Sequence, residues 1–566
     1  MSKLSKVLTD LDEQQRAAAE CVTGPVVIYA GAGTGKTRTI THRIAHAVLS
    51  KTHEAHSTLA VTFTTRAAGE LRSRLGQLGV SGVQVRTFHS AALRQLRFFY
   101  PQVFNKELPA LLPSKFKMVA NAAAKCHINA GTETVRDIAS EIEWAKVNIY
   151  SPEVYRAKAT ELRRSVGLGV TSEQVAKVYE AYLAGLDEQN SMDFEDVLLL
   201  NVAILENFPD VAAQVRSQYR NFTVDEFQDV SPVQFELLKL WLGNRDDVCV
   251  VGDPAQTIYS FTGATSTYLK NFKKYFPRTQ EFELTNNYRS TKPIVELANQ
   301  VLAKDDVDSL RLRTKIEVGP KVQLKDYSND EAEASAVTNQ IKDLIRAGVE
   351  PRDIAILFRI NSQSEVFEAA LAEEKIPVTL RGAERFFERP EVKNALLNLR
   401  AGLQISSDHK LSQTVKDILS SLGWRQYAPE GGRATLDTWE SLNTLVELAI
   451  DLEKSDPQAT LVDFVALLDQ RNEMEYAPSA NAVTLASIHA AKGLEWRAVF
   501  LVGLSEGLLP ISHATKADEF AEERRLFYVA ITRAKENLAL SWSHSRHRDS
   551  KGYREPSSLL RDLVIK

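Results

Sequence analysis

The most constraining feature of this sequence is a short apolar run followed at once by a glycine-rich loop. The run Val26–Ala30 reads VVIYA, and the loop Gly31–Thr37 reads GAGTGKT. Apolar, β-branched runs of this length are typical of buried parallel strands. The residues after the loop follow a helical pattern to about Leu49. A strand, a glycine-rich turn and a helix in this order predict a phosphate-binding P-loop in an α/β domain.

The loop carries the chemistry that a bound triphosphate requires. Its glycines let backbone N–H groups close around phosphate oxygens, and the N-terminus of the helix adds positive potential. We expect Lys36 to reach the β- and γ-phosphates and Thr37 to ligate Mg²⁺. The generic pattern begins with glycine where this chain has Ala30, so Gly31 and Gly33 supply the flexibility. The loop residues expected to hold the nucleotide are Ala30, Gly31, Ala32, Gly33, Thr34, Gly35, Lys36 and Thr37.

A second strand end supplies the acidic side chains that hydrolysis needs. The apolar run Phe222–Val224 is followed directly by Asp225 and Glu226. We expect Asp225 to hold the metal and Glu226 to be the general base for the attacking water. An acidic pair alone more often marks a solvated helix start, so this interpretation depends on its combination with the P-loop.

The rest of the chain alternates short apolar runs with helical segments. This alternation favours doubly wound α/β domains, and 566 residues correspond to about four folding units. Two long stretches, 96–189 and 386–480, read as mostly helical and are interpreted as insertions. Further strands are expected near Thr58, Phe222, Asp247, Ile354, Ala498 and Leu538.

Composition excludes several classes of protein. Hydrophobic residues are 44% and charged residues 25% of the chain, which is ordinary for a globular protein and unlike a disordered or collagenous one. With 69 basic and 73 acidic residues the formal charge is −4, which neither demands nor excludes nucleic acid as a partner. The three cysteines form no C-x-x-C pair, which argues against a zinc knuckle or a disulfide framework. No long apolar stretch is present, so we expect a cytoplasmic protein with no membrane partner.

The set of motifs along the chain is more specific than any one of them. In order they are LDEQQ, AVTFTTRAAGEL, TFHS, MDFEDVLL, VDEFQDVSPVQ, VVGDPAQTIYSFTGA, LTNNYRS, LFRINSQS, SIHAAKGLEW and YVAITRAK. On these motifs the chain resembles the UvrD/Rep/PcrA group of superfamily 1 DNA helicases over essentially its whole length. Within that group, GDPAQTIYSFTGA is most similar to the second, actinobacterial UvrD-type branch, whose extra C-terminal domains we expect this chain to lack.

The resemblance implies an α/β fold with two RecA-like P-loop domains, each carrying a mainly helical insertion. It implies an ATP cleft between the two motor domains. The expected limits are 1–95 and 190–286 for the first motor domain (1A), 96–189 for its insertion (1B), 287–385 and 481–566 for the second motor domain (2A), and 386–480 for a shortened insertion (2B).

The resemblance also implies roles for residues outside the P-loop. Two arginines stabilise charge on the transferring phosphoryl group only when the motor domains close, and this couples closure to hydrolysis. The implied catalytic set is Lys36, Glu226, Gln256, Arg289 and Arg533. The implied nucleotide contacts are Gln15 on the adenine, Arg38 beside the P-loop, Gln256 as γ-phosphate sensor, Tyr288 stacked on the adenine, Arg289 on the γ-phosphate, Glu495 on the ribose and Arg533 as arginine finger.

Strand binding is expected to use aromatic rings, which stack on any base without sequence preference. Core packing is the other interpretation of each ring. The residues that match strand contacts in the family are Phe63, His89, Phe194, Tyr259, Phe261, Arg359, Asn361 and His489.

The second insertion differs from those of the family. Residues 386–480 contain 9 basic and 15 acidic residues, a net charge of −6, whereas residues 93–185 contain 13 and 9, a net charge of +4. A duplex-binding surface needs cations to replace condensed counterions. The insertion is also shorter than usual and has no Gly-Ile-Gly type loop. We therefore expect strong translocation on single strands but weak autonomous unwinding.

Taken together, these features predict an ATP-dependent 3′–5′ DNA helicase or single-strand translocase acting in repair or replication. It would use ATP and Mg²⁺, bind single-stranded or 3′-tailed DNA, and work with repair or replication proteins. Three alternatives stay open: an ATPase dependent on single-stranded DNA that acts as a switch or needs a partner to unwind, the nuclease-free subunit of a helicase–nuclease, and a P-loop NTPase unrelated to nucleic acid. The presence of both Arg289 and Arg533 argues against a simple switch.

Overall fold

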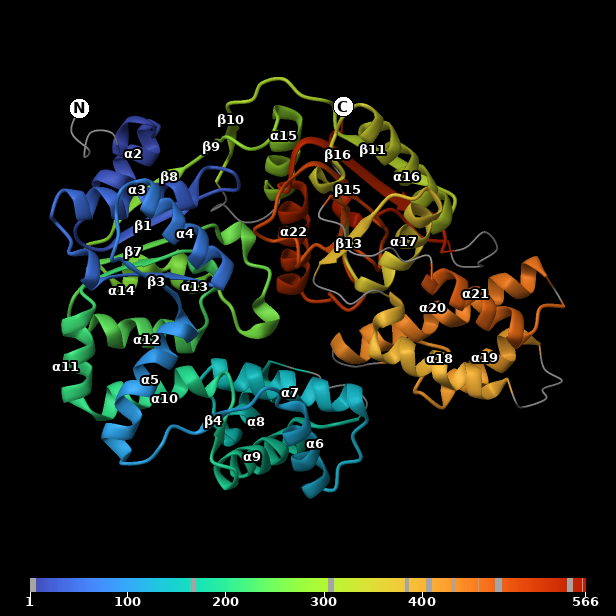
Figure 1. The fold of residues 1–566 in the computed structure, drawn as a ribbon, viewed down its shortest axis with the longest axis horizontal. Coiled ribbons are helices and arrows are strands. Elements are labelled where there is room, and N and C mark those ends of the chain that lie inside the picture. The colour runs from blue at the N-terminus through green and yellow to red at the C-terminus, as the bar shows by residue number, and fades with distance from the viewer. Residues whose placement is uncertain are drawn as a thin grey trace. The chain divides into compact units, whose positions relative to one another are not determined.

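The computed structural model divides the chain into two compact units (Figure 1). Unit 1 comprises Met1–Tyr288 and Asp308–Arg313, and unit 2 comprises Arg289–Val307 and Thr314–Lys566. Each unit contains a six-stranded sheet, which confirms the expected α/β class. The structure describes residues 7–162, 164, 169–303, 310–381, 386–403, 410–429, 433–456, 458–473, 481–546, 553–561 and 563–565.

The sheet of unit 1 is parallel, with strand order β3-β2-β6-β7-β1-β8. Because the strands are parallel, their carboxyl ends meet at one edge, where ligands bind in such sheets. Two edge strands, β3 and β8, were not expected, because edge strands expose polar residues and lack a continuous apolar run. The strands are β1 (Val26–Ala30), β2 (Thr58–Thr62), β3 (Gln84–Thr87), β6 (Asn221–Val224), β7 (Val248–Gly252) and β8 (Gln280–Leu284).

Helices cover both faces of this sheet. Successive residues of a strand point to opposite faces, so Val27 joins one apolar cluster while Val26 and Ile28 join the other. The helices are α2 (Glu13–Glu20), α3 (Lys36–Leu49), α4 (Thr65–Gln77), α5 (Phe88–Phe104), α10 (Asp196–Asn207), α11 (Pro209–Gln218), α12 (Pro232–Leu242), α13 (Thr267–Lys270) and α14 (Phe272–Tyr275).

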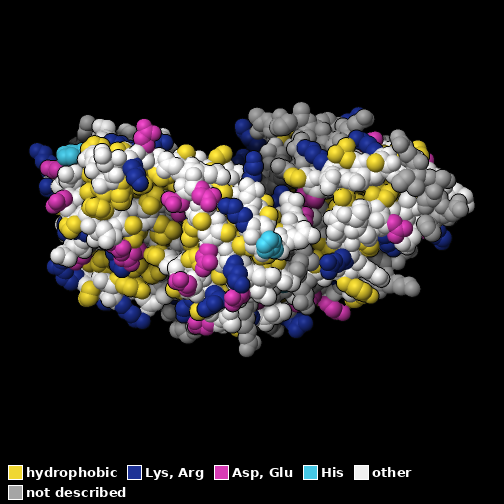
Figure 2. Space-filling model, turned by 90° about the horizontal axis from the view of Figure 1, so that it is seen from below, with side chains coloured by type: hydrophobic (Ala, Val, Ile, Leu, Met, Phe, Trp, Pro, Cys, Tyr) yellow, Lys and Arg dark blue, Asp and Glu magenta, His cyan; other side chains and the backbone are white. Residues whose placement is uncertain are grey.

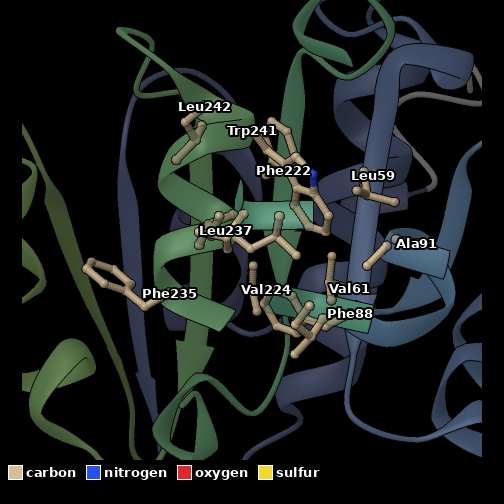
Figure 3. Close-up of a cluster of buried hydrophobic side chains, with 14 of the residues drawn as sticks. Leu59, Val61, Phe88, Ala91, Phe222, Val224, Phe235, Leu237, Trp241 and Leu242 are labelled. Carbon is tan, nitrogen blue, oxygen red and sulfur yellow. The ribbon is translucent and has the colours of Figure 1, made fainter. Parts of the chain in front are cut away.

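Trp241 organises the cluster that holds α5 against the sheet (Figure 3). Its ring stacks on Phe88 of α5 at a centroid distance of 5.9 Å and on Phe222 of β6 at 6.2 Å. Its indole N–H donates to Gln95 at 3.0 Å, so the buried polar atom is satisfied. These contacts fix the start of α5, where His89 lies.

The first insertion forms a helical subdomain of unit 1 with an apolar cluster of its own. It contains α6 (Phe116–Lys125), α7 (Thr132–Val147), α8 (Pro152–Glu161) and α9 (Ser172–Glu188), and the short strands β4 (Ala110–Leu111) and β5 (Ser191–Met192) form a parallel pair. Buried Lys146 lies 2.7 Å from both Asp193 and Asp196. The domain limits stay predictions, and α5 runs without a break across residue 95.

The sheet of unit 2 is also parallel, with strand order β11-β16-β15-β12-β14-β13. The expected strands near Ile354, Ala498 and Leu538 are present as β12, β15 and β16. The elements are β11 (Gln323–Tyr327), β12 (Ile354–Phe358), β13 (Val378–Arg381), β14 (Val483–Ser487), β15 (Trp496–Leu501) and β16 (Ala534–Ser543), with α15 (Lys292–Leu302), α16 (Asp330–Arg346), α17 (Ser364–Glu373) and α22 (Ala517–Ile531).

The second insertion is helical where it is described, and its helices bury an apolar cluster of their own. They are α18 (Pro390–Gly402), α19 (Leu411–Ser420), α20 (Arg433–Ser455) and α21 (Leu461–Glu473). Among the described helices, none is long and apolar enough to cross a bilayer. On the face of the molecule in Figure 2, acidic and basic side chains are interspersed among apolar and uncharged ones.

Candidate functional site

The P-loop connects the carboxyl end of β1 to the first residues of α3. Gly33 and Gly35 have φ angles of 71° and 84°, a left-handed conformation that favours glycine. The segment after β8 fixes the loop from one side: the side-chain amide of Asn287 donates to the carbonyl of Ala32 at 2.7 Å, and the N–H of Tyr288 donates to that of Gly33 at 2.9 Å. The loop is therefore held in place by the protein itself.

Two of the expected base contacts, Gln15 and Tyr288, lie on the same side of this loop. Gln15 is buried, and its amide donates to the carbonyl of Thr34 at 2.9 Å. Asp12 joins the two residues, because its carboxylate accepts the N–H of Gln15 at 2.7 Å and the hydroxyl of Tyr288. Burial opposes ionisation of Asp12, but these hydrogen bonds and one from Asn286 hold its pKa below the ordinary value.

Tyr288 is 43% exposed, so its ring has a face open to a planar ligand. Arg38 is exposed beside the loop and donates to the carbonyl of Asp10 at 2.7 Å. Asp12 was missed from the sequence, although D-x-x-Q at positions 12–15 is a helix-capping pattern that could have revealed it.

The expected acidic pair lies at the end of β6, next to the P-loop lysine. Glu226 Oε2 is 3.8 Å from Lys36 Nζ, and that ammonium has no hydrogen-bond acceptor among the described residues. Asp225 is buried and accepts the N–H of Glu226 at 2.9 Å. Burial, and then the neighbouring charge of Glu226, raise the pKa of Asp225 to about 7, while Lys36 opposes the shift.

These groups fit a magnesium–triphosphate ligand. A buried ammonium without an acceptor calls for an anion, and a buried carboxyl with a raised pKa calls for a cation. In the described part of the chain, no group of three or more His, Cys, Asp or Glu side chains could hold a metal ion. Mg²⁺ bound together with a nucleotide takes one or two carboxylates and the substrate phosphates as ligands. Asp225 and the hydroxyl of Thr37 are the ligands that the protein would supply.

Gln228 links the end of β6 to the end of β7. Its amide N–H donates to Glu226 at 2.5 Å, and its amide oxygen accepts the N–H of Asp253 at 3.0 Å. Asp253 in turn accepts from the side chain of Gln256 at 2.7 Å, so the expected sensor is oriented by a buried carboxyl. Burial raises the pKa of Asp253, although Lys36 opposes the shift. Gln228 and Asp253 were not expected from the sequence, because the sequence around a polar residue does not reveal its hydrogen-bond partners.

In unit 2, the expected nucleotide residues gather at the amino ends of β15 and β16. Arg289 Nε lies 2.5 Å from one oxygen of Glu495, and Lys535 Nζ lies 2.9 Å from the other. Partial burial opposes ionisation of Glu495, but Arg289 and Lys535 hold its pKa below the ordinary value. Lys535 was not expected, and its place two residues after Arg533 is the signal that could have revealed it.

Arg533 is buried in the same group. Its Nε donates to the carbonyl of Val529 at 2.9 Å, and its Nη1 donates to that of Leu494 at 3.2 Å. The backbone carbonyl of Arg533 accepts the N–H of Trp496 at 3.0 Å, which ties the residue to the start of β15. The guanidinium is thus positioned by the backbone, close to Glu495.

Four of the expected strand contacts of unit 1 form two aromatic pairs, and Phe63 stands apart. His89 stacks on Phe194 at a centroid distance of 3.8 Å, and Phe194 is 52% exposed. Burial lowers the pKa of His89 to about 4, so its ring is neutral at pH 7. Tyr259 and Phe261 lie 6.2 Å apart, and Phe261 is 43% exposed. Phe63 packs partly against the core cluster and contacts Phe88 edge-on at 6.4 Å.

The expected strand contacts of unit 2 lie at the carboxyl ends of β12 and β14, and they are less exposed. Arg359 is 7% exposed and forms a two-pronged ion pair with Glu523, with an Nη2–Oε1 distance of 2.7 Å. The side-chain oxygen of Asn361 is buried with no hydrogen-bond donor among the described residues. His489 is 9% exposed and follows β14. The structure thus brings the three residues to one edge of the sheet, with Arg359 already bound to a carboxylate.

Comparison with known proteins gives a consistent result over nearly the whole chain. The family model of the UvrD/REP helicase N-terminal domain matches residues 11–277, and that of the UvrD-like helicase C-terminal domain matches residues 282–430 and 423–545. Two similar proteins, both named ATP-dependent DNA helicase UvrD2, come from Mycobacterium tuberculosis (strain ATCC 25618 / H37Rv) and Mycobacterium bovis. Each is 46% identical to this chain over 577 residues, and the alignment covers 99% of this chain and 82% of the relative. The ATP-dependent DNA helicase PcrA of Staphylococcus aureus (strain NCTC 8325 / PS 47) is 28% identical over 624 residues, which cover 96% of this chain and 84% of the relative. The chain therefore belongs to the UvrD/REP helicase family.

Proposed function

We propose that this protein is an ATP-dependent DNA helicase that translocates 3′ to 5′ on single-stranded DNA in the cytoplasm, during repair or replication. The observation that carries the proposal is the buried Lys36 ammonium, which lacks a hydrogen-bond acceptor and lies 3.8 Å from Glu226. This geometry suits a γ-phosphate and an attacking water. The relatives named UvrD2 and PcrA support DNA as the second substrate.

In this proposal, the P-loop residues 30–37 hold the triphosphate, and Gln15, Arg38 and Tyr288 hold the base. Thr37 and Asp225 would hold Mg²⁺, which would neutralise charge on the triphosphate. Glu226 accepts a proton from the water whose oxygen attacks the γ-phosphorus, and ADP leaves. Gln228 holds the carboxylate of Glu226 in place, and Gln256 contacts the γ-phosphate.

Unit 2 would supply the remaining cations. Arg289 and Arg533 stabilise negative charge on the transferring phosphoryl group when the motor domains close. Arg289 must leave its ion pair with Glu495, which then becomes available to the ribose. Hydrolysis is thereby coupled to closure, and repeated closure moves the strand.

The strand itself would run over the exposed rings of unit 1 and the carboxyl edge of the sheet of unit 2. Phe194 and Phe261 offer the most exposed faces for base stacking, with His89 beside Phe194 and Tyr259 beside Phe261, and Phe63 is a further contact. Arg359, Asn361 and His489 complete the path. The domain limits 1–95 and 190–286, 96–189, 287–385 and 481–566, and 386–480 belong to this proposal.

A second candidate function is an ATPase that needs a partner protein to unwind duplex DNA. The observation that favours it is the net charge of −6 on residues 386–480, because an acidic surface binds duplex poorly. Repair or replication proteins are the partners this candidate requires.

Strand displacement measured beside ATP turnover tests both candidates. The full chain is given duplexes with a 3′ tail, a 5′ tail or no tail, and ATP hydrolysis is measured with no nucleic acid, with single-stranded DNA and with the matching RNA. We expect DNA-stimulated hydrolysis and displacement from the 3′ tail, with K36A as the inactive control. Stimulation without displacement supports the second candidate. Displacement only from the 5′ tail refutes the polarity, and hydrolysis indifferent to DNA refutes both candidates.

A further inference from the structure

Unit 1 carries six arginines on β3, on α5, on α11 and in the segments before β6 and β7, and the nucleotide site uses none of them. Two precede strands at the amino edge of the sheet, whereas the P-loop and Glu226 lie at the carboxyl edge. The others come from β3, α5 and α11. We call this group the arginine surface; its members are Arg86, Arg94, Arg97, Arg216, Arg220 and Arg245.

Hydrogen bonds fix two members against the protein backbone. Arg245 Nη2 donates to the carbonyl of Tyr219 at 2.9 Å, and Arg216 Nε donates to that of Leu240 at 2.9 Å. Leu240 lies in the last turn of α12, where cations are favoured by the helix dipole. Burial, and then the like charges of Arg216 and Arg220, hold the pKa of Arg245 below its ordinary value, although Asp247 opposes the shift. Capping of α12 explains these two arginines.

Capping does not explain the other four. Arg94, Arg97 and Arg220 are exposed, and their guanidinium groups make no hydrogen bond or ion pair with any described residue. Arg86 is half-buried, and its Nε has no acceptor within the described part of the chain. Like charges gathered on one surface destabilise a fold, although Asp247 offsets part of this repulsion at Arg245. Their retention at one surface indicates an anionic ligand.

The two carboxylates that follow Arg245 in the sequence both have other partners. Asp246 pairs with Arg278 at 2.7 Å, and Asp247 accepts the N–H of Gly24 at 3.3 Å. Arg86 and Arg94 both oppose the rise that burial causes in the pKa of the Tyr219 hydroxyl, and Arg245 donates to the carbonyl of the same residue at 2.9 Å. Arginines of β3 and α5 therefore approach Tyr219 together with Arg245.

An exposed ring follows the two arginines of α5. Phe98 is 60% exposed and follows Arg94 by four residues, so the two share one face of the helix. Arg97 precedes it directly. Guanidinium groups bind phosphates through two parallel hydrogen bonds, and an exposed ring stacks on a nucleobase. An acidic peptide would satisfy the arginines but has no flat base for Phe98.

We propose that the arginine surface binds the phosphate backbone of a second stretch of nucleic acid, separate from the strand path at the carboxyl edges of the sheets. The choice of DNA as the ligand rests on the proposed function. The surface would hold DNA that has left or not yet entered the motor, and it would raise affinity for long strands without touching the nucleotide.

The test compares the full chain with the triple variant R94Q/R97Q/R220Q on single strands of 8 to 60 nucleotides. The matched control is K270Q/K273Q/K274Q, which removes three exposed cations from α13 and α14 of the same unit. We expect equal affinity of all three proteins for the shortest strands. Above a threshold length the arginine variant should bind about tenfold more weakly, with a slope of log Kobs against log salt that is smaller by about 2, as for three lost phosphate contacts. Thermal unfolding midpoints check that each variant is folded.

Other outcomes overturn the proposal. Equal affinities of wild type and arginine variant at every length show that no second stretch is bound, and an equal loss in the lysine control shows a general charge effect. A loss already present at the shortest length assigns the arginines to the motor's own strand path. Loss of binding to poly-glutamate with unchanged DNA binding shows that an acidic protein is the ligand. If no strand of any length stimulates ATP hydrolysis in the wild type, the proposed function fails instead, independently of the comparison of affinities.

Discussion

In the two six-stranded parallel sheets, the residues expected to bind nucleotide lie at opposite edges. In unit 1, Lys36 and Glu226 follow the carboxyl ends of β1 and β6. In unit 2, Glu495 and Arg533 precede the amino ends of β15 and β16, while β12 is followed by Arg359 rather than by a glycine-rich loop. A parallel sheet therefore does not by itself decide where the charged site lies. The loop that follows a strand decides it, because only the glycine-rich loop exposes backbone N–H groups to a phosphate.

The charges are also paired differently in the two units. Lys36 has a carboxylate at 3.8 Å and no hydrogen-bond acceptor among the described residues, whereas Arg289 is 2.5 Å from Glu495. Unit 1 is thus preorganised for an anion, whereas in unit 2 the arginine proposed to contact the γ-phosphate is held in an ion pair. Glu495 pairs with both Arg289 and Lys535, and its negative charge offsets the repulsion between these two cations.

The largest effect is expected from removing the proposed base in unit 1. E226Q keeps the shape of the side chain but cannot accept the proton of the attacking water, so kcat for ATP hydrolysis should fall by about 10³-fold. Strand binding should persist, because the strand path does not include this residue. Steady-state turnover together with fluorescence anisotropy of a labelled strand measures both quantities.

E236Q is the matched control for this variant. Glu236 lies on α12 in the same unit and pairs with Lys239 at 2.6 Å, away from the P-loop. Its replacement should leave kcat within about twofold. A wild-type rate for E226Q would refute the assignment of the base and remove the basis for contrasting the two units.

A smaller effect is expected from the paired arginine of unit 2. R289A should lower kcat by about 10²-fold, as for loss of one donor to a developing charge. K535Q removes the other cation that pairs with Glu495 and should change kcat by less than about fivefold, because Lys535 is not proposed to contact the phosphate. Single-turnover hydrolysis at saturating ATP and DNA compares the two. Equal losses in both variants would mean that Arg289 only maintains the ion-pair group.

The two sheets show how far the fold could be predicted from the sequence. Central strands such as β1 and β12 are continuous apolar runs, because helices cover both of their faces, and such runs are visible in the sequence. Edge strands such as β8 and β11 expose charged residues, so they carry no such signal. Their positions depend on pairing with a neighbour far away in the chain, which no local pattern contains.

The residues of the candidate site also divide into those that the sequence predicts and those that it does not. The P-loop and the acidic pair could be predicted because each follows a recognisable strand. Asp12, Gln228 and Lys535 were not predicted, since their importance depends on a hydrogen bond or ion pair to a residue elsewhere, and only Asp12 and Lys535 left a local signal in the sequence. The sequence motifs also contain no sign that Arg359 is bound to Glu523, because the two residues are 164 positions apart.

A moderate effect is expected for strand binding by the exposed rings of unit 1. F194A removes a half-exposed ring stacked on neutral His89 and should weaken binding of single-stranded DNA by about tenfold, within the ~1–3 kcal/mol of a base stack. F116A is the control, because Phe116 on α6 is 47% exposed but lies outside the proposed path. Titration of a labelled strand at fixed salt gives both affinities. If the two variants bind equally, the strand does not stack on Phe194, and the assignment of the strand path to that ring fails.

The smallest effect concerns stability, and it separates the two units again. Glu333 in unit 2 is buried, and burial, followed by the charge of Asp330, raises its pKa to about 7, although hydrogen bonds from Gly503 and Ser541 and the charge of Arg554 oppose the shift. Because this pKa exceeds that of an unfolded glutamate, the folded state binds more protons between about pH 4.5 and 7. The free energy of unfolding of unit 2 should therefore fall as pH rises through that window.

E333Q is neutral at every pH and should flatten this dependence, while E331Q, at an exposed neighbouring position, should not. Thermal unfolding of the wild type from pH 5 to pH 8 should show the midpoint of unit 2 falling by about 2–4 °C more than that of E333Q. The transition of unit 1 should be the same in both proteins, because Glu333 lies outside it. An unchanged pH slope in E333Q would show that Glu333 is already ionised in the folded protein. In that case the hydrogen bonds from Gly503 and Ser541 outweigh the cost of burying the charge. Glu333 would then resemble Glu495, the other carboxylate of unit 2 whose partners keep it ionised.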